Sequence, residues 1–137
     1  YDSNWLSIIE KNIANLSVQL LINRKSFIDQ LNKDLEKVKR PFNTCQVDVY
    51  HELSKLGDIF NSEELISKYI TVLSNNREID SALNKTSLTV NKVTIKIFNN
   101  TDKIIEAKNC STGEQKSILL SIFLSVAKMV KNTLCRT

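Results

Sequence analysis

Apolar residues recur through the first third of the chain at the spacing of an amphipathic helix. From Trp5 to Val38 the steps between them are mostly three, four or seven residues. Pro41 interrupts the pattern, because proline cannot continue a helix. The pattern therefore predicts one long helix, which at about 1.5 Å per residue would extend roughly 50 Å and would need a partner to cover its apolar stripe. The stripe consists of Ile9, Ile13, Leu16, Leu20, Phe27, Leu31 and Leu35.

A second helix is predicted from Asn61 or Ser62, either of which can cap it, to about Asp80. Its apolar stripe is the expected surface for packing against the first helix, which would give an antiparallel helical arm. Residues 42–60 follow no single period and are expected to form a connector with a short turn ended by Gly57. The stripe of the second helix is Leu65, Ile66, Tyr69, Ile70 and Leu73.

After Asn84 the pattern changes to β-branched runs. Residues 86–90 and 93–98 predict two strands, residues 99–102 a turn, and Ile104-Ile105 a further short apolar segment. A last helix is predicted from Ser111, with period and length that favour a buried helix. Its apolar positions are Ile118, Leu119, Ile122, Phe123, Val126, Met129 and Val130.

These elements predict a predominantly helical α+β chain. Residues 1–82 would form the antiparallel helical arm, and residues 83–137 a small strand-and-helix part of a larger lobe. In a complete protein the strands would join a larger sheet. By themselves they would leave unpaired edges, so self-association or loose order is expected in the second part.

Composition adds three constraints. The chain has 137 residues, only 2 glycines and 1 proline, and a net charge of +4, which permits a polyanion partner without requiring one. Three distant cysteines without metal or redox spacing favour a reduced, cytoplasmic compartment. Residues 118–130 are apolar, but Ser121, Ser125 and Lys128 interrupt them, so no membrane-spanning segment is expected. Because the chain opens on Tyr1, it is expected to be an excised segment.

The most informative stretch is residues 109–120, Asn-Cys-Ser-Thr-Gly-Glu-Gln-Lys-Ser-Ile-Leu-Leu. Ser111 and Thr112 can cap the following helix, and Gly113 lets a backbone N–H approach a ligand closely. Free N–H groups and the helix dipole attract an anion at such a position. Many ordinary helices begin in the same way, so residue types alone favour a plain cap over a phosphate site.

The same stretch carries a resemblance. Residues 111–116, Ser-Thr-Gly-Glu-Gln-Lys, followed by Ser-Ile-Leu-Leu-Ser-Ile, resemble the signature motif of RecF-type DNA replication and repair proteins, the counterpart of Ser-Gly-Gly-Gln in ABC-type and SMC-type ATPases. In such chains a long helix, a polar connector, a second helix and a strand-bearing segment precede the signature. The resemblance thus extends over nearly the whole chain and implies the middle helical segment and signature strip of an ABC-type ATPase lobe.

The resemblance implies an ATP sandwiched between two subunits, the Walker motifs of one facing the signature of the other. The nucleotide-contacting residues in this chain would be Ser111, Thr112, Gly113 and Gln115. Ser111 would donate its hydroxyl to the γ-phosphate, Gly113 would offer its backbone N–H, and Gln115 would help to position the loop. Glu114 and Lys116 would serve local capping and charge balance.

The complete family member would bind ATP with Mg²⁺ and form an ATP-dependent homodimer in the cytoplasm. It would act on DNA at gapped or single-strand/double-strand junctions during repair, recombination and the SOS response, and would help to load recombinase together with recombination mediator proteins. Neither a metal site nor a membrane partner is expected for this chain.

The upstream passage also resembles the family but departs from it at one place. Residues 76–80, Asn-Arg-Glu-Ile-Asp, lead towards Thr89, Val90, Asn91 and Lys92, where the family commonly has Gly, Pro, His and Arg. A turn and two polar side chains are therefore altered, which leaves open that the chain is a degenerate copy.

No complete catalytic apparatus is visible. With glycine only at Gly57 and Gly113, a Walker A loop cannot form within these residues, and no Walker B run follows the signature helix. His51 is the only histidine and is expected on a solvated turn, so a catalytic role is disfavoured. The chain alone is therefore expected not to hydrolyse ATP.

A second interpretation stays open, and a third is disfavoured. The long helix and its partner could form an interaction module that docks another protein or dimerises without nucleotide. A membrane-surface helix is disfavoured, because basic residues do not line one face beside Trp or Phe anchors.

Overall fold

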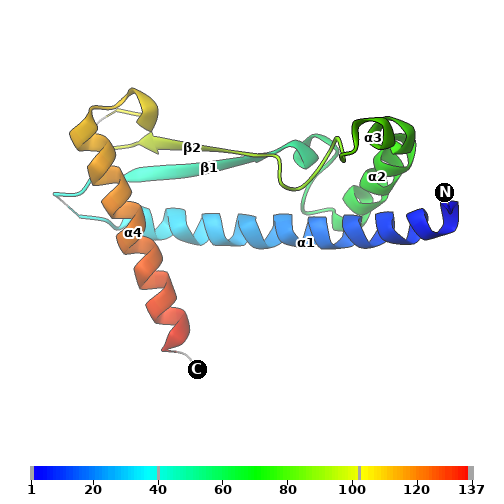
Figure 1. Ribbon diagram of the computed structural model, residues 1–137. Coiled ribbons are helices and arrows are strands. Elements are labelled where there is room, and N and C mark those ends of the chain that lie inside the picture. The colour runs from blue at the N-terminus through cyan, green and yellow to red at the C-terminus, as the bar shows by residue number, and fades with distance from the viewer. Residues whose placement is uncertain (1, 40, 102, 136–137) are drawn as a thin grey trace. The chain divides into compact units, whose positions relative to one another are not determined.

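The computed structural model describes residues 2–39, 41–101 and 103–135. Helices predominate and accompany one small three-stranded antiparallel sheet, so the α+β class is confirmed (Figure 1). The elements are α1 (Ser3–Glu36), β1 (Cys45–His51), the 3-10 turn η1 (Glu52–Lys55), α2 (Ser62–Asn75), α3 (Arg77–Leu83), β2 (Val93–Asn99), β3 (Ile105–Glu106), the 3-10 turn η2 (Ala107–Asn109) and α4 (Thr112–Leu134).

The chain forms two compact units that are not consecutive segments. Unit 1 contains the described residues up to Arg24 together with Tyr50–Thr94, and unit 2 contains Lys25–Val49 and the described residues from Ile95 onward. Helix α1 and strands β1 and β2 each contribute to both units. These units therefore divide the chain differently from the boundary expected near residue 82, which concerns domains of a complete protein and stays a prediction.

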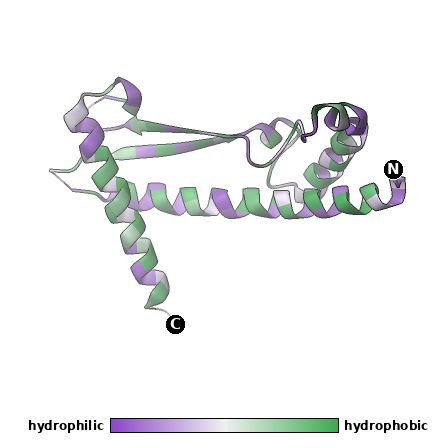
Figure 2. Ribbon diagram, viewed as in Figure 1, coloured by the Kyte–Doolittle hydropathy of each residue, from purple (hydrophilic) through white to green (hydrophobic). Residues whose placement is uncertain are grey.

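The core of unit 1 forms where α2 packs on the first half of α1. Ala14, Val18 and Leu21 of α1 are buried together with residues of α2 and η1, and polar and apolar residues alternate along α1 as its amphipathic pattern requires (Figure 2). The partners from α2 and η1 are Leu53, Leu65, Tyr69 and Leu73. The packing of the predicted α2 stripe on α1 is thus confirmed. The stripe predicted for α1 was wrong over its first three turns and beyond, because the helix turns Ala14, Val18 and Leu21 to the core. The predicted positions Ile13, Leu16, Leu20 and Phe27 are exposed.

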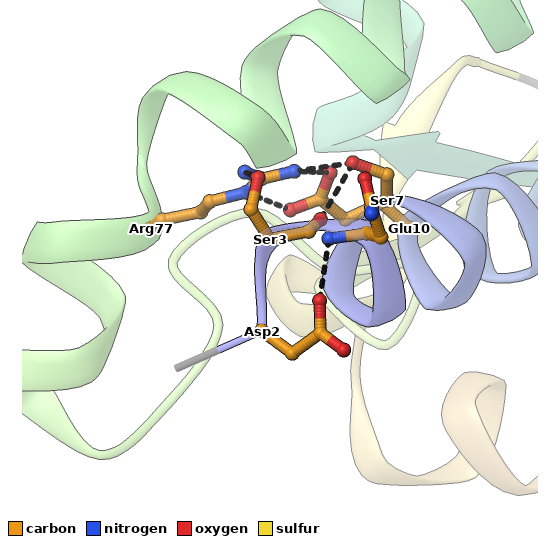
Figure 3. Close-up of polar contacts among 6 residues, drawn as sticks. Asp2, Ser3, Ser7, Glu10 and Arg77 are labelled. Carbon is orange, nitrogen blue, oxygen red and sulfur yellow. Dashed lines mark hydrogen bonds and ion pairs between the residues drawn. The ribbon is translucent and has the colours of Figure 1, made fainter.

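An ion pair joins α3 to α1 inside unit 1. The Arg77 guanidinium donates to both carboxylate oxygens of Glu10, with Nε–Oε1 at 2.6 Å and Nη2–Oε2 at 2.8 Å. Nη2 also donates to the Ser7 hydroxyl at 3.0 Å (Figure 3). The Glu10 side chain is 8% exposed and that of Arg77 19%. Such a two-pronged contact satisfies charges that burial would otherwise penalise.

The core of unit 2 forms between the end of α1, the sheet and α4. Leu31 and Leu35 are buried with Cys45, Val47 and Ile118. β3 pairs antiparallel with β2, with Phe98 opposite Glu106 and Asn99 opposite Ile105.

The side chain of Asn32 on α1 makes two hydrogen bonds to the backbone of β1 of the kind that a neighbouring strand would make. Its amide donates to the Val47 carbonyl at 2.9 Å and accepts from the Val47 N–H at 2.8 Å. Both backbone groups of Val47 are thus satisfied, as burial of a strand residue requires.

The secondary structure differs from the sequence-based expectation in three segments. Residues 42–60 contain strand β1, since Cys45 and Val47 alternate with exposed residues and enter the core of unit 2. The second helix is two helices, because Asn76 ends α2 and precedes α3. Residues 86–90 form a loop.

The loop at residues 86–90 is held by side chains in place of a sheet. Leu88 and Val90 pack against the core of unit 1, and the Leu88 carbonyl accepts from the Tyr69 hydroxyl at 2.8 Å. The Ser87 N–H donates to Asp80 at 3.0 Å. Burial of the apolar residues and local hydrogen bonds thus outweigh β propensity. The predicted strand at residues 93–98 is confirmed as β2. Of the turn expected at residues 99–102, Asp102 lies outside the described residues.

Helix α4 begins where predicted, but it is less buried than its length and period indicate. Ile118, Ser121 and Ser125 face the core of unit 2, whereas six large apolar residues of the same helix are half-exposed or more. These are Leu119, Leu120, Phe123, Leu124, Val130 and Leu134. By length and composition alone, α4 is long and apolar enough to cross a membrane. Core helices of soluble proteins often meet the same two criteria. The expectation that no segment of this chain would meet them was wrong.

The Arg77–Glu10 pair gives a direct stability test. We expect Arg77→Ala to lower the free energy of unfolding by about 3–5 kcal/mol, because it leaves the buried Glu10 carboxylate unpaired. Lys25→Ala, which removes the exposed 3.3 Å pair with Asp29, should cost less than about 1 kcal/mol. Urea unfolding monitored by circular dichroism measures both variants, and equal small losses would contradict a buried pair.

Thiol reactivity tests the core of unit 2. Burial raises the pKa of Cys45 to about 11, so this thiol stays protonated near pH 8, whereas Cys135 is exposed. Because the thiolate is the reactive form, we expect a disulfide reagent at pH 8 to modify Cys135 first and Cys45 only in denaturant. Single Cys→Ser variants assign the kinetic phases. Equally fast reaction of Cys45 and Cys135 in the folded chain would contradict this core.

Candidate functional site

Ser111 is the cap of helix α4. Its backbone is extended, with φ −63° and ψ 160°, and its hydroxyl oxygen accepts from the Glu114 N–H at 3.3 Å. The Gln115 N–H donates to the Ser111 carbonyl at 2.9 Å and closes the first helical turn. The predicted cap is therefore confirmed, and it is the arrangement that a Ser-x-x-Glu sequence produces at a helix start.

The Glu114 carboxylate connects the cap to β2. Oε1 accepts from the Ser111 hydroxyl at 2.8 Å, and Oε2 accepts from the Asn99 amide at 3.0 Å. Asn99 is buried, and its side-chain oxygen Oδ1 accepts from the Thr101 N–H at 3.1 Å and from the Thr101 hydroxyl at 2.9 Å. From the sequence, Asn99 was expected only to form part of a turn. Its bond to Glu114 could not be predicted, because the two residues are fifteen positions apart and no local pattern links them.

The remaining predicted nucleotide-contacting residues lie on the same exposed strip. Thr112, Gly113 and Gln115 are all exposed, and a Cβ built on Gly113 would meet nothing within 4 Å. The Gln115 amide donates to the Ala107 carbonyl at 2.9 Å and so ties the helix start to turn η2. The strip is thus an open surface on a fixed loop. Its roles towards a nucleotide stay predictions.

Two serines of the motif anchor α4 to the segment before β1. The Ser117 hydroxyl accepts from the Asn43 N–H at 2.9 Å and donates to the Asn43 side-chain oxygen at 3.0 Å. The Ser121 hydroxyl donates to the Asn43 carbonyl at 2.9 Å. These bonds hold the beginning of α4 within unit 2 and so determine where its N-terminal end presents the Ser111 hydroxyl.

The electrostatics of this strip work in two directions. The start of α4 presents the positive end of the helix dipole, which favours an anion. The carboxylate of Glu114, however, already accepts from the Ser111 hydroxyl. A phosphate that took this hydroxyl would therefore have to displace the Glu114 carboxylate or turn the hydroxyl away from it.

The other residues considered for chemistry belong to unit 1. Thr89–Lys92 forms a turn closed by a bond from the Lys92 N–H to the Thr89 carbonyl at 3.4 Å, although the sequence there lacks the Gly-Pro that the resemblance led us to expect. His51 is buried at the end of β1, so its expected place on a solvated turn was wrong. Burial, and then the positive charge of Arg24, lower the pKa of His51. Across residues 2–39, 41–101 and 103–135, no cluster of three or more His, Cys, Asp or Glu side chains that could hold a metal is present.

Curated proteins similar to this chain share one printed name, "DNA replication and repair protein RecF". The chain is 35% identical to that of Rickettsia typhi over 137 residues, covering 96% of the chain and 37% of the relative. It is 34% identical to that of Rickettsia massiliae over 125 residues, covering 90% and 34%. For Rickettsia bellii the identity is 31% over 126 residues, covering 91% and 34%.

The chain spans about a third of the length of these relatives. It matches no family model, and no solved structure matches it significantly.

The cap of α4 can be tested without any ligand. We expect Ser111→Ala to lower the free energy of unfolding by about 1 kcal/mol, because the Glu114 N–H loses its acceptor. Thr112→Ala, at the neighbouring exposed position, should change stability by less than about 0.5 kcal/mol. Urea unfolding measures the difference, and hydrogen exchange of the Glu114 amide localises it. Equal effects of the two substitutions would contradict the cap.

Proposed function

This chain is a RecF-type segment, and from that premise we propose that it supplies the signature side of an ATP site to a DNA replication and repair protein. The observation that carries the proposal is the open strip at the start of α4, where an exposed Ser111 hydroxyl and an unobstructed Gly113 stand side by side. A γ-phosphate reaching across from a partner's Walker loop would accept from the Ser111 hydroxyl and approach the Gly113 backbone closely.

The exposed face of α4 supports the view that further chain is needed around this strip. A helix seldom carries large, half-exposed apolar residues along its whole length unless another surface covers them in the complete protein. The relatives extend well beyond the region matched here, so they contain chain that could provide this cover. We infer that α4 packs into an ATPase lobe in the complete protein.

At the level of the whole protein the proposal is broader. ATP with Mg²⁺ would join two copies, and the assembled protein would act in the cytoplasm on DNA with single-stranded gaps or junctions. Cooperation with recombination mediator proteins, recombinase loading and a place in the SOS response belong to this proposal. The described residues supply no Walker A or Walker B motif, so the segment by itself would not hydrolyse ATP.

A helical interaction module is the second candidate. It is favoured by apolar residues that α1 leaves exposed outside the two cores, among them Trp5 at 59%, Ile8 at 62% and Leu16 at 68%. Such a module would associate with a partner whether or not nucleotide is present, which separates it from the first proposal.

The test is nucleotide-dependent association. The segment is immobilised, and its affinity for the complete RecF of Rickettsia typhi is measured in the presence and absence of ATP and Mg²⁺. We expect ATP to strengthen binding at least about tenfold, and Ser111→Arg or Gly113→Asp to abolish that gain, because each places bulk or a carboxylate where the phosphate would lie. Gly113→Ala is the finer probe, since the added Cβ has space in the segment itself.

Ser54→Arg, at an exposed position of unit 1, is the matched control for added charge and should leave the gain unchanged. If Ser111→Arg and Gly113→Asp leave association unchanged with and without ATP, the helical interaction module is the correct interpretation. Tight ATP binding by the isolated segment would also count against the proposal.

A further inference from the structure

The Asn99 side chain at the end of β2 binds the same carboxylate that occupies the Ser111 hydroxyl. Its Nδ2 donates to Glu114 Oε2 at 3.0 Å, while Glu114 Oε1 accepts from the Ser111 hydroxyl at 2.8 Å. Asn99 is 5% exposed, whereas Ser111 and Glu114 are exposed. A buried amide on the sheet therefore holds a carboxylate that lies on the open strip at the start of α4.

The hydrogen bonds around Asn99 fix the direction of its amide. The Asn99 Oδ1 accepts from the Thr101 N–H at 3.1 Å and from the Thr101 hydroxyl at 2.9 Å. The Thr101 hydroxyl oxygen accepts in turn from the Thr44 N–H at 3.1 Å, so its own proton is directed to Asn99. Because its oxygen already has these donors, the amide presents its NH₂ group to Glu114. The Glu114 carboxylate thus has a side-chain donor on each oxygen.

A nucleotide would affect these two donors differently. A hydroxyl has one proton, so Ser111 cannot donate to a γ-phosphate and to Glu114 at the same time. The Asn99 amide is buried behind the strip and would keep its bond. When a partner covers the strip, water is excluded, and a carboxylate left there without a donor is unfavourable. Among the described residues, Asn99 is then the side-chain donor that Glu114 retains.

We propose that Asn99 is a positioning residue for the nucleotide: it retains the Glu114 carboxylate on the side of β2, so that the Ser111 hydroxyl can turn to the γ-phosphate. Asn99 would not contact the phosphate and would act only through Glu114. The inference rests on the proposed function, which takes the strip as the nucleotide site from the similarity to RecF. It adds a residue of the sheet to the groups on which ATP-dependent association depends.

Asn99→Asp tests the NH₂ side of the amide alone. Aspartate keeps an oxygen for both Thr101 bonds, but it replaces the donor to Glu114 by a second oxygen that repels the carboxylate. The readout is the ATP-dependent gain, which is the ratio of the affinities for the complete RecF of Rickettsia typhi with and without ATP and Mg²⁺. We expect Asn99→Asp to reduce this gain at least about fivefold, because the lost hydrogen bond has a charged acceptor. Affinity without ATP should stay the same, since Ser111 then keeps its bond to Glu114.

Glu114→Ala distinguishes positioning from a merely structural role of Asn99. It removes the carboxylate that competes for the Ser111 hydroxyl, so the ATP-dependent gain should be at least as large as in the unchanged chain. Added to Glu114→Ala, Asn99→Asp should have no further effect, because no carboxylate is left to hold. A structural role of Asn99 would lower the gain by the same factor with and without Glu114→Ala.

Asn100→Ala is the matched control, because it removes the same type of side chain at the next position. The Asn100 side-chain oxygen has no hydrogen-bond partner among the described residues. Its backbone N–H donates to the Thr44 carbonyl at 2.8 Å, and the substitution keeps that bond. We expect the ATP-dependent gain to stay the same in this variant.

Circular dichroism and urea unfolding show whether each variant is folded, and hydrogen exchange of the Glu114 amide shows whether the cap persists. If Asn99→Asp is unfolded, Thr101→Val replaces it. Valine lacks the hydroxyl that orients the Asn99 amide. Thr101→Val should therefore also reduce the ATP-dependent gain, and should not do so when Glu114→Ala is present.

The outcomes separate this inference from the proposed function. A gain that Asn99→Asp lowers and Asn99→Asp/Glu114→Ala restores supports the positioning role. A gain that Asn99→Asp leaves unchanged while Ser111→Arg abolishes it overturns the role of Asn99 and leaves the proposed function intact. Loss of the gain in Glu114→Ala alone, or an equal loss in Asn100→Ala, overturns the role of Asn99 as well. If the unchanged chain shows no ATP-dependent gain, the proposed function fails, and the role of Asn99 fails with it.

Discussion

The long helix α1 is the constraint on which the rest of the structure depends. A helix of 34 residues exposes an apolar stripe along its length and cannot bury that stripe on itself. Two parts of the chain solve this problem separately, α2 with η1 over Ala14 to Leu21, and the sheet with α4 over Leu31 to Leu35. Each compact unit therefore contains a part of α1 and assembles its own core on it. The order of elements along the chain consequently differs from the grouping of elements in space.

Where packing buries a polar group of one element, a side chain of another element forms the hydrogen bonds that this group needs. Asn32 satisfies both backbone groups of Val47, and Arg77 satisfies the carboxylate of Glu10. Ser121 occupies the carbonyl of Asn43 in the same manner. These contacts specify how each pair of elements fits together, since a shifted register would leave a buried polar group without a partner. Hydrophobic periodicity does not specify this fit.

The start of α4 is an ordered helix cap whose residues are also the ones assigned to the nucleotide in the proposed function. Its residues first make a sound helix cap, with Ser111 and Glu114 satisfying each other. Asn99 holds the carboxylate at the cap from a different element, which keeps the strip ordered without a ligand. In the proposed function, a phosphate at Ser111 would compete with this internal carboxylate for the same hydroxyl.

Much of the architecture was determined by the sequence alone, because its signals are local. The period of residues 5–38 defined α1, the β-branched run at residues 93–98 defined β2, and Ser111 before an apolar helix defined the start of α4. The resemblance that pointed to RecF rested on contiguous residues as well, and the similar proteins bear it out.

Tertiary structure decided what depends on partners distant in the chain. The run at residues 86–90 has strand composition, yet packing of Leu88 and Val90 on the core of unit 1 and bonds to Tyr69 and Asp80 make it a loop. His51 is buried because β1 carries it into unit 1, and Asn99 reaches Glu114 because β2 places it there. Such contacts join residues separated by many positions, and only the folded chain brings them together. The sequence therefore determined the elements and the motif, and the fold determined which side chains meet.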